Sequence, residues 1–222
     1  MNVGDPMVKI KICGFTNSED AKQACQLGVD LVGVILVPES PHYVSIDAAR
    51  DIFRAVERTV AKVAVFAPHR PEDIKETCRK LNPDYLQFHL TFPLPDLLRI
   101  KEELNVGIII VVSIPRGVGY SKEIVDRAVE VSKAADFLLI DTKGPTGGGT
   151  GLTHDWHLSA MIRSVVEKPV FLAGGLNPSN VGQAIKMVRP YGVDVATGVE
   201  INPRKKDPKL MRDFVEAVRR AE

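Results

Sequence analysis

A lysine and a cysteine two residues apart, Lys11 and Cys13 in the segment KIKICG, have a spacing that could support nucleophilic or basic chemistry. Residues two apart on a strand face the same side, so the Lys11 ammonium would lie beside the Cys13 sulfur and stabilise a thiolate. Two other interpretations stay open. Cysteine is often a small buried apolar residue, and Lys11 could pair with a buried carboxylate that has no catalytic role.

An aspartate closes the apolar segment FLLID at Asp141, shortly before the glycine-rich segment GPTGGGTG, which includes Gly148 and Gly149. Burial among apolar side chains would raise the pKa of this carboxyl, which suits a general acid. The glycine-rich segment is interpreted as a loop that closes over a substrate. Alternatively, Asp141 caps a loop or accepts backbone N–H groups, and the glycines mean simple disorder.

Glycine turns follow two later apolar segments, at Gly174 and Gly175 in LAGGLNPSN and at Gly198 in VATGVE. Glycine lets backbone N–H groups approach an anion closely, and the last two loops of a barrel often bind phosphate in this way. Taken singly, each glycine could simply form a tight turn. Their pairing in consecutive loops favours a phosphate site.

Eight short apolar segments, each followed by a longer amphipathic stretch, must position these residues. Several are apolar at successive positions, which is typical of parallel strands covered on both faces. We therefore predict an α/β fold, a single (β/α)8 TIM barrel over residues 1–222, with 1–6 as an N-terminal extension. An open doubly wound sheet is the alternative, but no GxGxxG follows the first strand. The strands are expected at residues 8–13, 31–36, 60–66, 85–89, 107–112, 137–141, 169–173 and 193–197.

Capping residues mark where the helices between these strands should begin. Asn17, Ser45 and Ser121 precede amphipathic stretches, and Pro178 suits a first helical turn. Near the end of the chain, residues 202–209 form the basic segment NPRKKDPK. We expect this segment to be a turn with a solvated face.

The overall composition points to a small-molecule partner. The 29 basic and 28 acidic residues give a net charge of +1, which offers no electrostatic footprint for nucleic acid or an anionic membrane. The three cysteines show no CxxC spacing, which argues against a disulfide framework and a zinc site. Without a signal peptide or a membrane-spanning apolar run, the chain is expected to be cytoplasmic, as a monomer or a homodimer.

The segments KICGFTNSEDA, SPHYVS, QFH, LLIDT, GGTGLTHDW, LAGGLNPSNV and VRPYGVDVATGVE, taken in this order, resemble the phosphoribosylanthranilate isomerase family of tryptophan biosynthesis. The resemblance is collinear and covers nearly the whole chain. It implies a barrel that binds a small phosphorylated substrate, N-(5-phosphoribosyl)anthranilate. It further implies an Amadori rearrangement to 1-(2-carboxyphenylamino)-1-deoxyribulose 5-phosphate, with no cofactor and no metal.

The resemblance also implies roles for individual residues. Asp141 falls on the family's general acid, which protonates the furanose ring oxygen and opens the ring to a Schiff base. Cys13 falls on the general base, which as a thiolate removes the C2 proton. The phosphate site maps onto Gly174, Gly175 and the segment from Asp194 to Gly198. The full set of expected substrate- and phosphate-binding residues is Lys11, His42, Gln87, His89, Gly148, Gly149, Gly174, Gly175, Asp194, Thr197 and Gly198.

Three departures from the family pattern affect these expectations. His42 stands where the family usually has an arginine associated with the anthranilate carboxylate, and a histidine cannot supply a fixed bidentate fork. The usual QLHG becomes QFHLT at residues 87–91, and the usual SSG after the last strand becomes Ala196, Thr197 and Gly198. Either substrate binding is weaker or another basic group supplies the contact.

Two rival functions remain at this point. One is another ribose-phosphate isomerase of the barrel class that uses two aspartates, against which Cys13 counts because an aspartate would be expected at the end of the first strand. The other is a catalytically silent barrel that binds a phosphorylated metabolite or serves as a subunit. The departures at His42 and at residues 87–91 are its only support.

Overall fold

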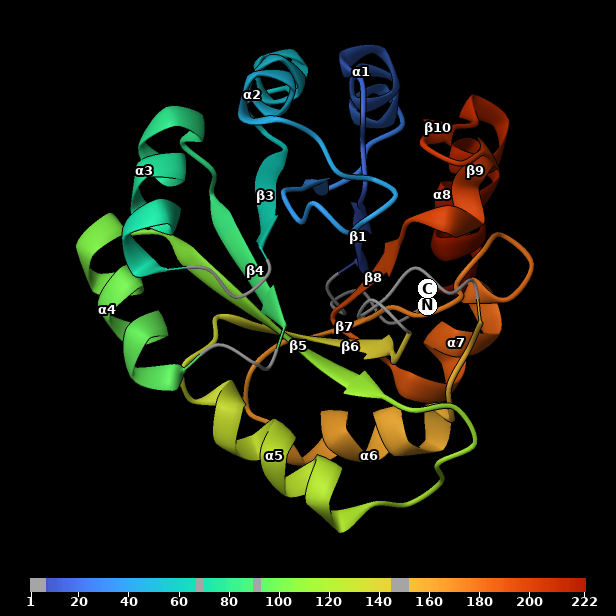
Figure 1. Ribbon diagram of the computed structural model, residues 1–222. Helices are drawn as coiled ribbons and strands as arrows, with labels where there is room; N and C mark the ends of the chain where they lie inside the picture. Colours follow the sequence, from blue (N-terminus) through green and yellow to red (C-terminus); the bar gives the residue numbers. More distant parts are fainter. Residues whose placement is uncertain (1–6, 67–69, 90–92, 145–151) are drawn as a thin grey trace.

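The computed structural model describes residues 7–66, 70–89, 93–144 and 152–222. Its eight main strands close into a barrel in sequence order, β1 to β8, and every neighbouring pair is parallel. Helices surround the barrel (Figure 1). The predicted (β/α)8 barrel is confirmed, and the open-sheet alternative is wrong because β1 pairs with both β2 and β8.

The strands lie where the apolar segments predict them. The largest differences are at β5, which continues to Ile114, and at β8, which ends at Val195. The strands are β1 Lys9–Ile12, β2 Leu31–Ile35, β3 Ala61–Phe66, β4 Tyr85–His89, β5 Gly107–Ile114, β6 Phe137–Thr142, β7 Val170–Leu172 and β8 Gly192–Val195.

Three of the four predicted helix starts are confirmed. The side chains of Asn17, Ser45 and Ser121 each accept a first-turn backbone N–H. The start at Pro178 is wrong, because Asn177 Oδ1 accepts the Ser179 N–H and the chain forms a turn before α7 begins. The helices are α1 Ser18–Gln26, α2 Ile46–Ala55, α3 Pro71–Leu81, α4 Leu94–Leu104, α5 Lys122–Ser132, α6 Trp156–Val165, α7 Val181–Val188 and α8 Pro208–Ala221.

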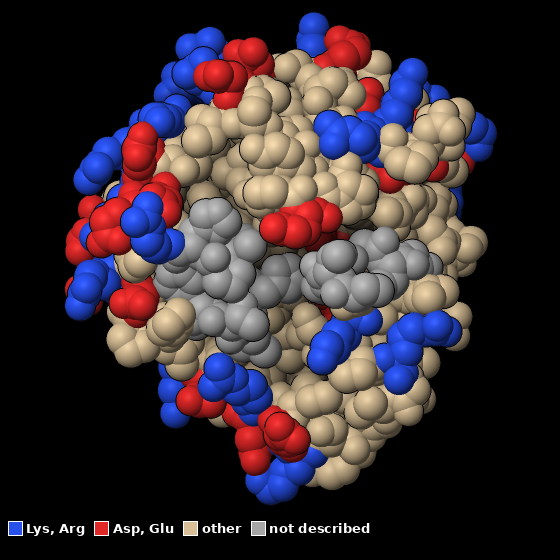
Figure 2. All heavy atoms as spheres, viewed as in Figure 1, with Lys and Arg blue, Asp and Glu red and all other residues tan. Residues whose placement is uncertain are grey.

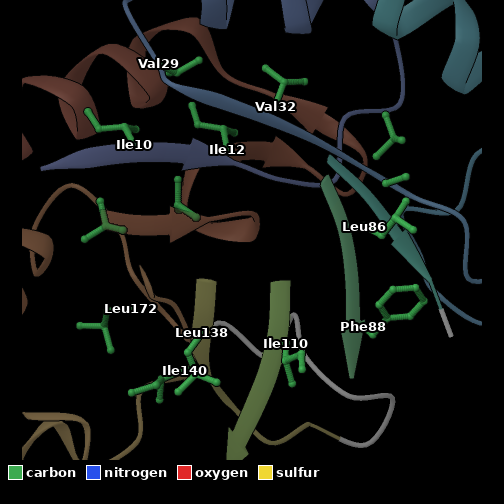
Figure 3. Packing of buried hydrophobic residues seen from close by; sticks show 14 of the residues in the cluster. Ile10, Ile12, Val29, Val32, Leu86, Phe88, Ile110, Leu138, Ile140 and Leu172 are labelled. Carbon is green, nitrogen blue, oxygen red and sulfur yellow. The ribbon is translucent and has the colours of Figure 1, made fainter. Parts of the chain in front are cut away.

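Alternate side chains of each strand serve two different cores. Ile10 and Ile12 of β1 belong to the layer between the barrel and its helices, as do Leu138 and Ile140 of β6 (Figure 3). The residues between them in sequence face the barrel interior instead. Strand β1 therefore turns Ile10 and Ile12 outward, and the candidate site residues Lys11, on the strand, and Cys13, directly after it, face inward.

Aromatic rings close the barrel at the amino-terminal ends of the strands. The Phe137 ring lies 5.1 Å from the ring of Tyr85, 5.4 Å from Phe171 and 5.5 Å from Tyr191. Aliphatic side chains such as Ile109 fill the layer above. Because the lower layers are filled with apolar groups, the polar interior residues gather at the carboxyl ends of the strands, where barrel chemistry takes place.

The basic segment at residues 202–209 differs from its prediction. It belongs to a hairpin of β9 Glu200–Asn202 and β10 Lys205–Lys206 that leads into α8 (Figure 1). Lys206 is 1% exposed, and its ammonium donates to Glu200 Oε1 at 2.7 Å and to the Ala196 carbonyl at 3.0 Å. The expected solvated face is therefore wrong for Lys206, because the hairpin turns this one lysine inward onto a buried carboxylate.

The surface agrees with the nearly balanced charge. On the face shown in Figure 2, basic and acidic side chains are interspersed around the periphery, without a continuous field of one sign. Within the described ranges, no helix is both long and apolar enough to cross a membrane.

Candidate active site

A buried ion pair lies at the carboxyl ends of β1 and β8. The register places Lys11 beside Asp194, and the Lys11 ammonium donates to Asp194 Oδ1 at 3.0 Å. Lys11 is fully buried and Asp194 is 8% exposed. Burial acts to lower the pKa of Lys11, but the charges of Asp194 and Cys13 raise it above its ordinary value. Lys11 therefore does pair with a buried carboxylate, and it also acts on Cys13.

Cys13 follows β1 directly and its side chain belongs to the interior cluster of the barrel. Burial raises the pKa of the Cys13 thiol, and Lys11 opposes this by its charge and by a side-chain hydrogen bond. The sulfur fits because β2 has a glycine opposite it. A Cβ atom on Gly33 would lie 2.6 Å from Cys13 Sγ. The site thus holds a thiol whose conversion to thiolate depends on neighbouring positive charge.

Asp141 lies near the carboxyl end of β6 and belongs to the same electrostatic group. Burial, with a smaller contribution from the Asp194 charge, raises the pKa of Asp141 to about 7. The Thr142 N–H, which donates to Asp141 Oδ1 at 2.7 Å, and the Lys11 charge act in the opposite direction. A carboxyl with this pKa is available in its protonated form near neutral pH, so Asp141 can donate a proton.

The arrangement brings together two titratable groups, the Asp141 carboxyl and the Cys13 thiol, whose proton affinities are separated. The carboxyl of Asp141 and the thiol of Cys13 share the Lys11–Asp194 pair as a common electrostatic partner. Such pairs of titratable groups with contrasting environments are characteristic of acid–base active sites. Among the described residues, no group of three or more His, Cys, Asp or Glu side chains is placed to hold a metal ion.

The two predicted glycine turns lie at the same end of the barrel. Gly174 and Gly175 both have positive φ, 85° and 66°, which only glycine adopts readily. Thr197 and Gly198 belong to a short 3₁₀ turn, Thr197–Val199, that follows β8. Gly198 packs directly on the backbone of Leu176, so the loops that follow β7 and β8 touch.

His42 is buried, and its Nε2 lies 2.8 Å from Glu200 Oε1. Glu200 also accepts the Lys206 ammonium. Burial acts to raise the pKa of Glu200, but the His42 hydrogen bond and the Lys206 charge together lower it. Sequence reasoning missed Glu200 and the buried role of Lys206. Glu200 and Lys206 are six residues apart, and this short separation was the signal that could have paired them. His42 offered no such signal because it is 158 positions away from Glu200.

Of the remaining predicted residues, only Gln87 has a side chain in the described part of the structure. Gln87 on β4 is 5% exposed, and its side-chain oxygen is buried with no hydrogen-bond partner in the described part of the chain. A buried acceptor of this kind is a natural contact for a ligand. His89 ends β4, but its side chain lies outside the described part of the structure, as do Gly148 and Gly149.

Residues 10–217 match the family model described as N-(5'phosphoribosyl)anthranilate (PRA) isomerase. The chain is 40% identical over 214 residues to the N-(5'-phosphoribosyl)anthranilate isomerase of Methanocella arvoryzae, which covers 96% of this chain and 99% of that protein. The phosphoribosyl anthranilate isomerase of Thermotoga maritima has a similar structure, with a TM-score of 0.86 and 35% identity over 96% of this chain and 99% of that one. Another phosphoribosyl anthranilate isomerase, solved in complex with reduced 1-(o-carboxyphenylamino)-1-deoxyribulose 5-phosphate, gives a TM-score of 0.83 at 32% identity over the same 96% and 99%.

Proposed function

Because the chain belongs to the N-(5'-phosphoribosyl)anthranilate isomerase family and is an isomerase of tryptophan biosynthesis, we propose that Asp141 and Cys13 are its general acid and general base. The reaction is the Amadori rearrangement of N-(5-phosphoribosyl)anthranilate to 1-(2-carboxyphenylamino)-1-deoxyribulose 5-phosphate. One observation supports this assignment most strongly. A partly buried carboxyl with a pKa raised to about 7 and a buried thiol share the Lys11–Asp194 pair at the carboxyl ends of the strands.

In the first step, Asp141 gives its proton to the furanose ring oxygen. The bond between C1 and that oxygen breaks, its electron pair goes to the oxygen, and the anilinic nitrogen forms a double bond to C1. The product is an open-chain, positively charged Schiff base, and Asp141 becomes a carboxylate. The raised pKa of Asp141 suits this transfer because the proton is retained near neutral pH and yet is given up readily.

In the second step, the Cys13 thiolate removes the proton from C2. The C–H electron pair moves into a C1–C2 double bond and neutralises the nitrogen, which gives an enolamine that tautomerises to the ketone. The thiol must lose its own proton beforehand, and burial opposes that loss. Lys11 favours the thiolate, and the cationic Schiff base adds a second positive charge close to the sulfur.

The substrate's two charged ends have separate binding regions in this proposal. The turns at Gly174–Gly175 and Thr197–Gly198 bind the phosphate through backbone N–H groups. His42 is the residue proposed to contact the anthranilate carboxylate, but its Nε2 is already engaged by Glu200. Only Nδ1 is left for the substrate, so His42 supplies at most one hydrogen bond where an arginine supplies two.

Turnover tests the proposed function directly. Freshly prepared N-(5-phosphoribosyl)anthranilate should lose its fluorescence faster with the wild-type chain than with heat-denatured chain or with buffer alone. Isolation of the ketone product from the same reaction distinguishes rearrangement from spontaneous hydrolysis. If the wild-type chain bound a phosphate ligand but gave no product, the proposed function would be wrong and the silent barrel would be the better interpretation.

Replacing Lys11 with methionine should shift the titration of the Cys13 thiol to higher pH. The change removes the nearest positive charge and leaves the Asp194 carboxylate without its partner beside the sulfur. The measurement is the pH dependence of the alkylation rate of Cys13 in a background where Cys25 and Cys78 are alanine. Lys9→Met is the matched control, because Lys9 lies on the same strand and pairs with Asp30 instead. An unchanged Cys13 titration in Lys11→Met would contradict the role of Lys11.

Replacing Gly33 with alanine should lower kcat by on the order of tenfold or more, because the added methyl group would displace the sulfur of Cys13. Steady-state kinetics on the folded variant measure the effect. Gly182→Ala is the control, since a Cβ atom on this helical glycine would meet nothing closer than 3.8 Å. Equal kcat values for the two variants would mean that the position of Cys13 is not critical.

A further inference from the structure

A chain of hydrogen bonds, partly buried at Asp141 and buried beyond it, connects Asp141 to helix α6. The Thr142 N–H donates to Asp141 Oδ1, and the Thr142 hydroxyl lies 2.9 Å from His154 Nδ1. On the other side of the ring, His154 Nε2 lies 2.6 Å from the hydroxyl of Ser159. Thr142 and Ser159 are fully buried, and His154 is 6% exposed. The chemistry proposed above assigns no role to this histidine.

The imidazole of His154 is neutral in this setting, and both of its nitrogens are used. Burial lowers the pKa of His154 to about 4, so the ring carries no charge at neutral pH. A neutral imidazole has one donor nitrogen and one acceptor nitrogen. The two hydroxyls therefore take opposite roles, one donating to the ring and the other accepting from it. The contacts form a satisfied bridge between the end of β6 and α6.

Thr142 is also confined by the loop that follows β7. Gly174 lies so close to Thr142 that a Cβ atom on this glycine would collide with the Thr142 hydroxyl and backbone nitrogen. The next glycine, Gly175, packs in the same way on the backbone of Leu152 and Thr153, directly before His154. Thr142 therefore has little freedom as long as its hydroxyl is held by the imidazole.

We propose that His154 is a positioning residue that fixes Thr142, whose backbone N–H in turn orients the carboxyl of Asp141. This inference rests on the proposed role of Asp141 as the general acid. Within the described residues, the two ring nitrogens of His154 contact the hydroxyls of Thr142 and Ser159. His154 acts on the proton-transfer step through Thr142, so its loss should lower kcat and leave KM nearly unchanged.

The hydrogen bond between His154 and the Thr142 hydroxyl should also influence the titration of Asp141, because it holds Thr142 in place. The Thr142 N–H stabilises the carboxylate and so lowers the pKa of Asp141, together with Lys11 on β1 and against Asp194 on β8. These two charged residues remain in place when His154 is substituted. A variant that releases Thr142 should therefore titrate Asp141 at a higher pH than the wild type.

The substitutions His154→Asn and His154→Gln provide the test, because each keeps an amide group near a different nitrogen of the imidazole ring. An asparagine at position 154 places its amide near Nδ1 and can keep the contact to Thr142, whereas a glutamine places its amide near Nε2 and can keep only the contact to Ser159. In His154→Gln we expect kcat to fall on the order of tenfold and the ¹³C carboxyl resonance of Asp141 to titrate at higher pH. His154→Asn should stay within about threefold of wild-type kcat, with the Asp141 titration unchanged.

Controls separate this inference from packing and from the proposed function. Thr142→Val keeps the shape and the backbone N–H but loses the hydroxyl, and it should behave like His154→Gln. Ser132→Ala removes a buried serine hydroxyl from α5, far from the site, and should leave kcat unchanged. The role of His154 would be overturned if His154→Asn, His154→Gln and Thr142→Val did not differ from one another in kcat or in the pKa of Asp141, provided that Asp141→Asn is impaired. An unimpaired Asp141→Asn would refute the general acid itself.

Discussion

Asp141→Asn should lower kcat by 10²-fold or more, within the range of roughly 10²- to 10⁴-fold that general acid catalysis contributes. The amide has the shape of the carboxyl and can still accept the Thr142 N–H, but it has no proton to give to the ring oxygen. KM should change little because the turns proposed to bind phosphate follow β7 and β8, whereas Asp141 is on β6. Fluorescence-monitored turnover at matched protein concentration measures both constants.

The pH profile of this variant adds a second, independent check. The productive form needs Asp141 protonated and Cys13 as thiolate, although Asp141 has a pKa of about 7 and the pKa of Cys13 is raised. That form is a minority of the molecules. When removal of the C2 proton limits the rate, kcat/KM follows the population of this productive form. The population rises with pH up to about 7, as the thiolate forms, and then levels off because Asp141 loses its proton.

The break near pH 7 should therefore belong to Asp141. In Asp141→Asn the residual kcat/KM should continue to rise through pH 7, because only the ionisation of Cys13 remains. A break that persists in the variant would assign it to another group. A wild-type kcat/KM that falls as pH rises through 7 would mean that ring opening limits the rate and that the thiolate is not required up to that step.

The sequence could predict the barrel, and the end of it at which the candidate site lies, for a physical reason. Strands covered on both faces are continuously apolar, so a charged or reactive residue near a strand end, such as Lys11 or Asp141, is conspicuous. Carboxyl ends of parallel strands lie at the same end of the barrel, so strand position alone brings these residues together. Neither conclusion needed any tertiary contact to be known in advance.

The contacts of Glu200, Lys206 and His154 could not be predicted in the same way. The Lys206 side chain is buried only because the hairpin of β9 and β10 turns it onto Glu200, whereas its two exposed basic neighbours favour a solvated turn. His154 lies between a glycine-rich segment and a helix cap, outside any periodic pattern, and its partner Thr142 belongs to another element. Buried polar pairs depend on the packing of distant elements, which local sequence patterns do not encode.

Cys13→Ser should lower kcat by on the order of 10²-fold or more, because a hydroxyl in place of the thiol is far too weakly acidic to supply an anionic base. Cys25→Ser is the matched control. Cys25 is a buried cysteine on α1, outside the site, so its substitution should leave kcat unchanged and affect only stability. If Cys13→Ser kept more than about a tenth of wild-type turnover, another group would have to remove the C2 proton.

The two site variants should fail at different steps, and this difference tests the mechanism more sharply than the size of either loss. In Cys13→Ser, Asp141 can still open the ring, so the cationic Schiff base should form in the site and be reduced at C1 by added borohydride. In Asp141→Asn the ring should stay closed, and reduction should not exceed the background measured without protein. If the reduced Schiff base formed equally in both variants, ring opening would not depend on Asp141. If it formed in neither variant, Cys13 would be needed for ring opening as well. The proposed assignment of Asp141 to the first step and Cys13 to the second would then be wrong.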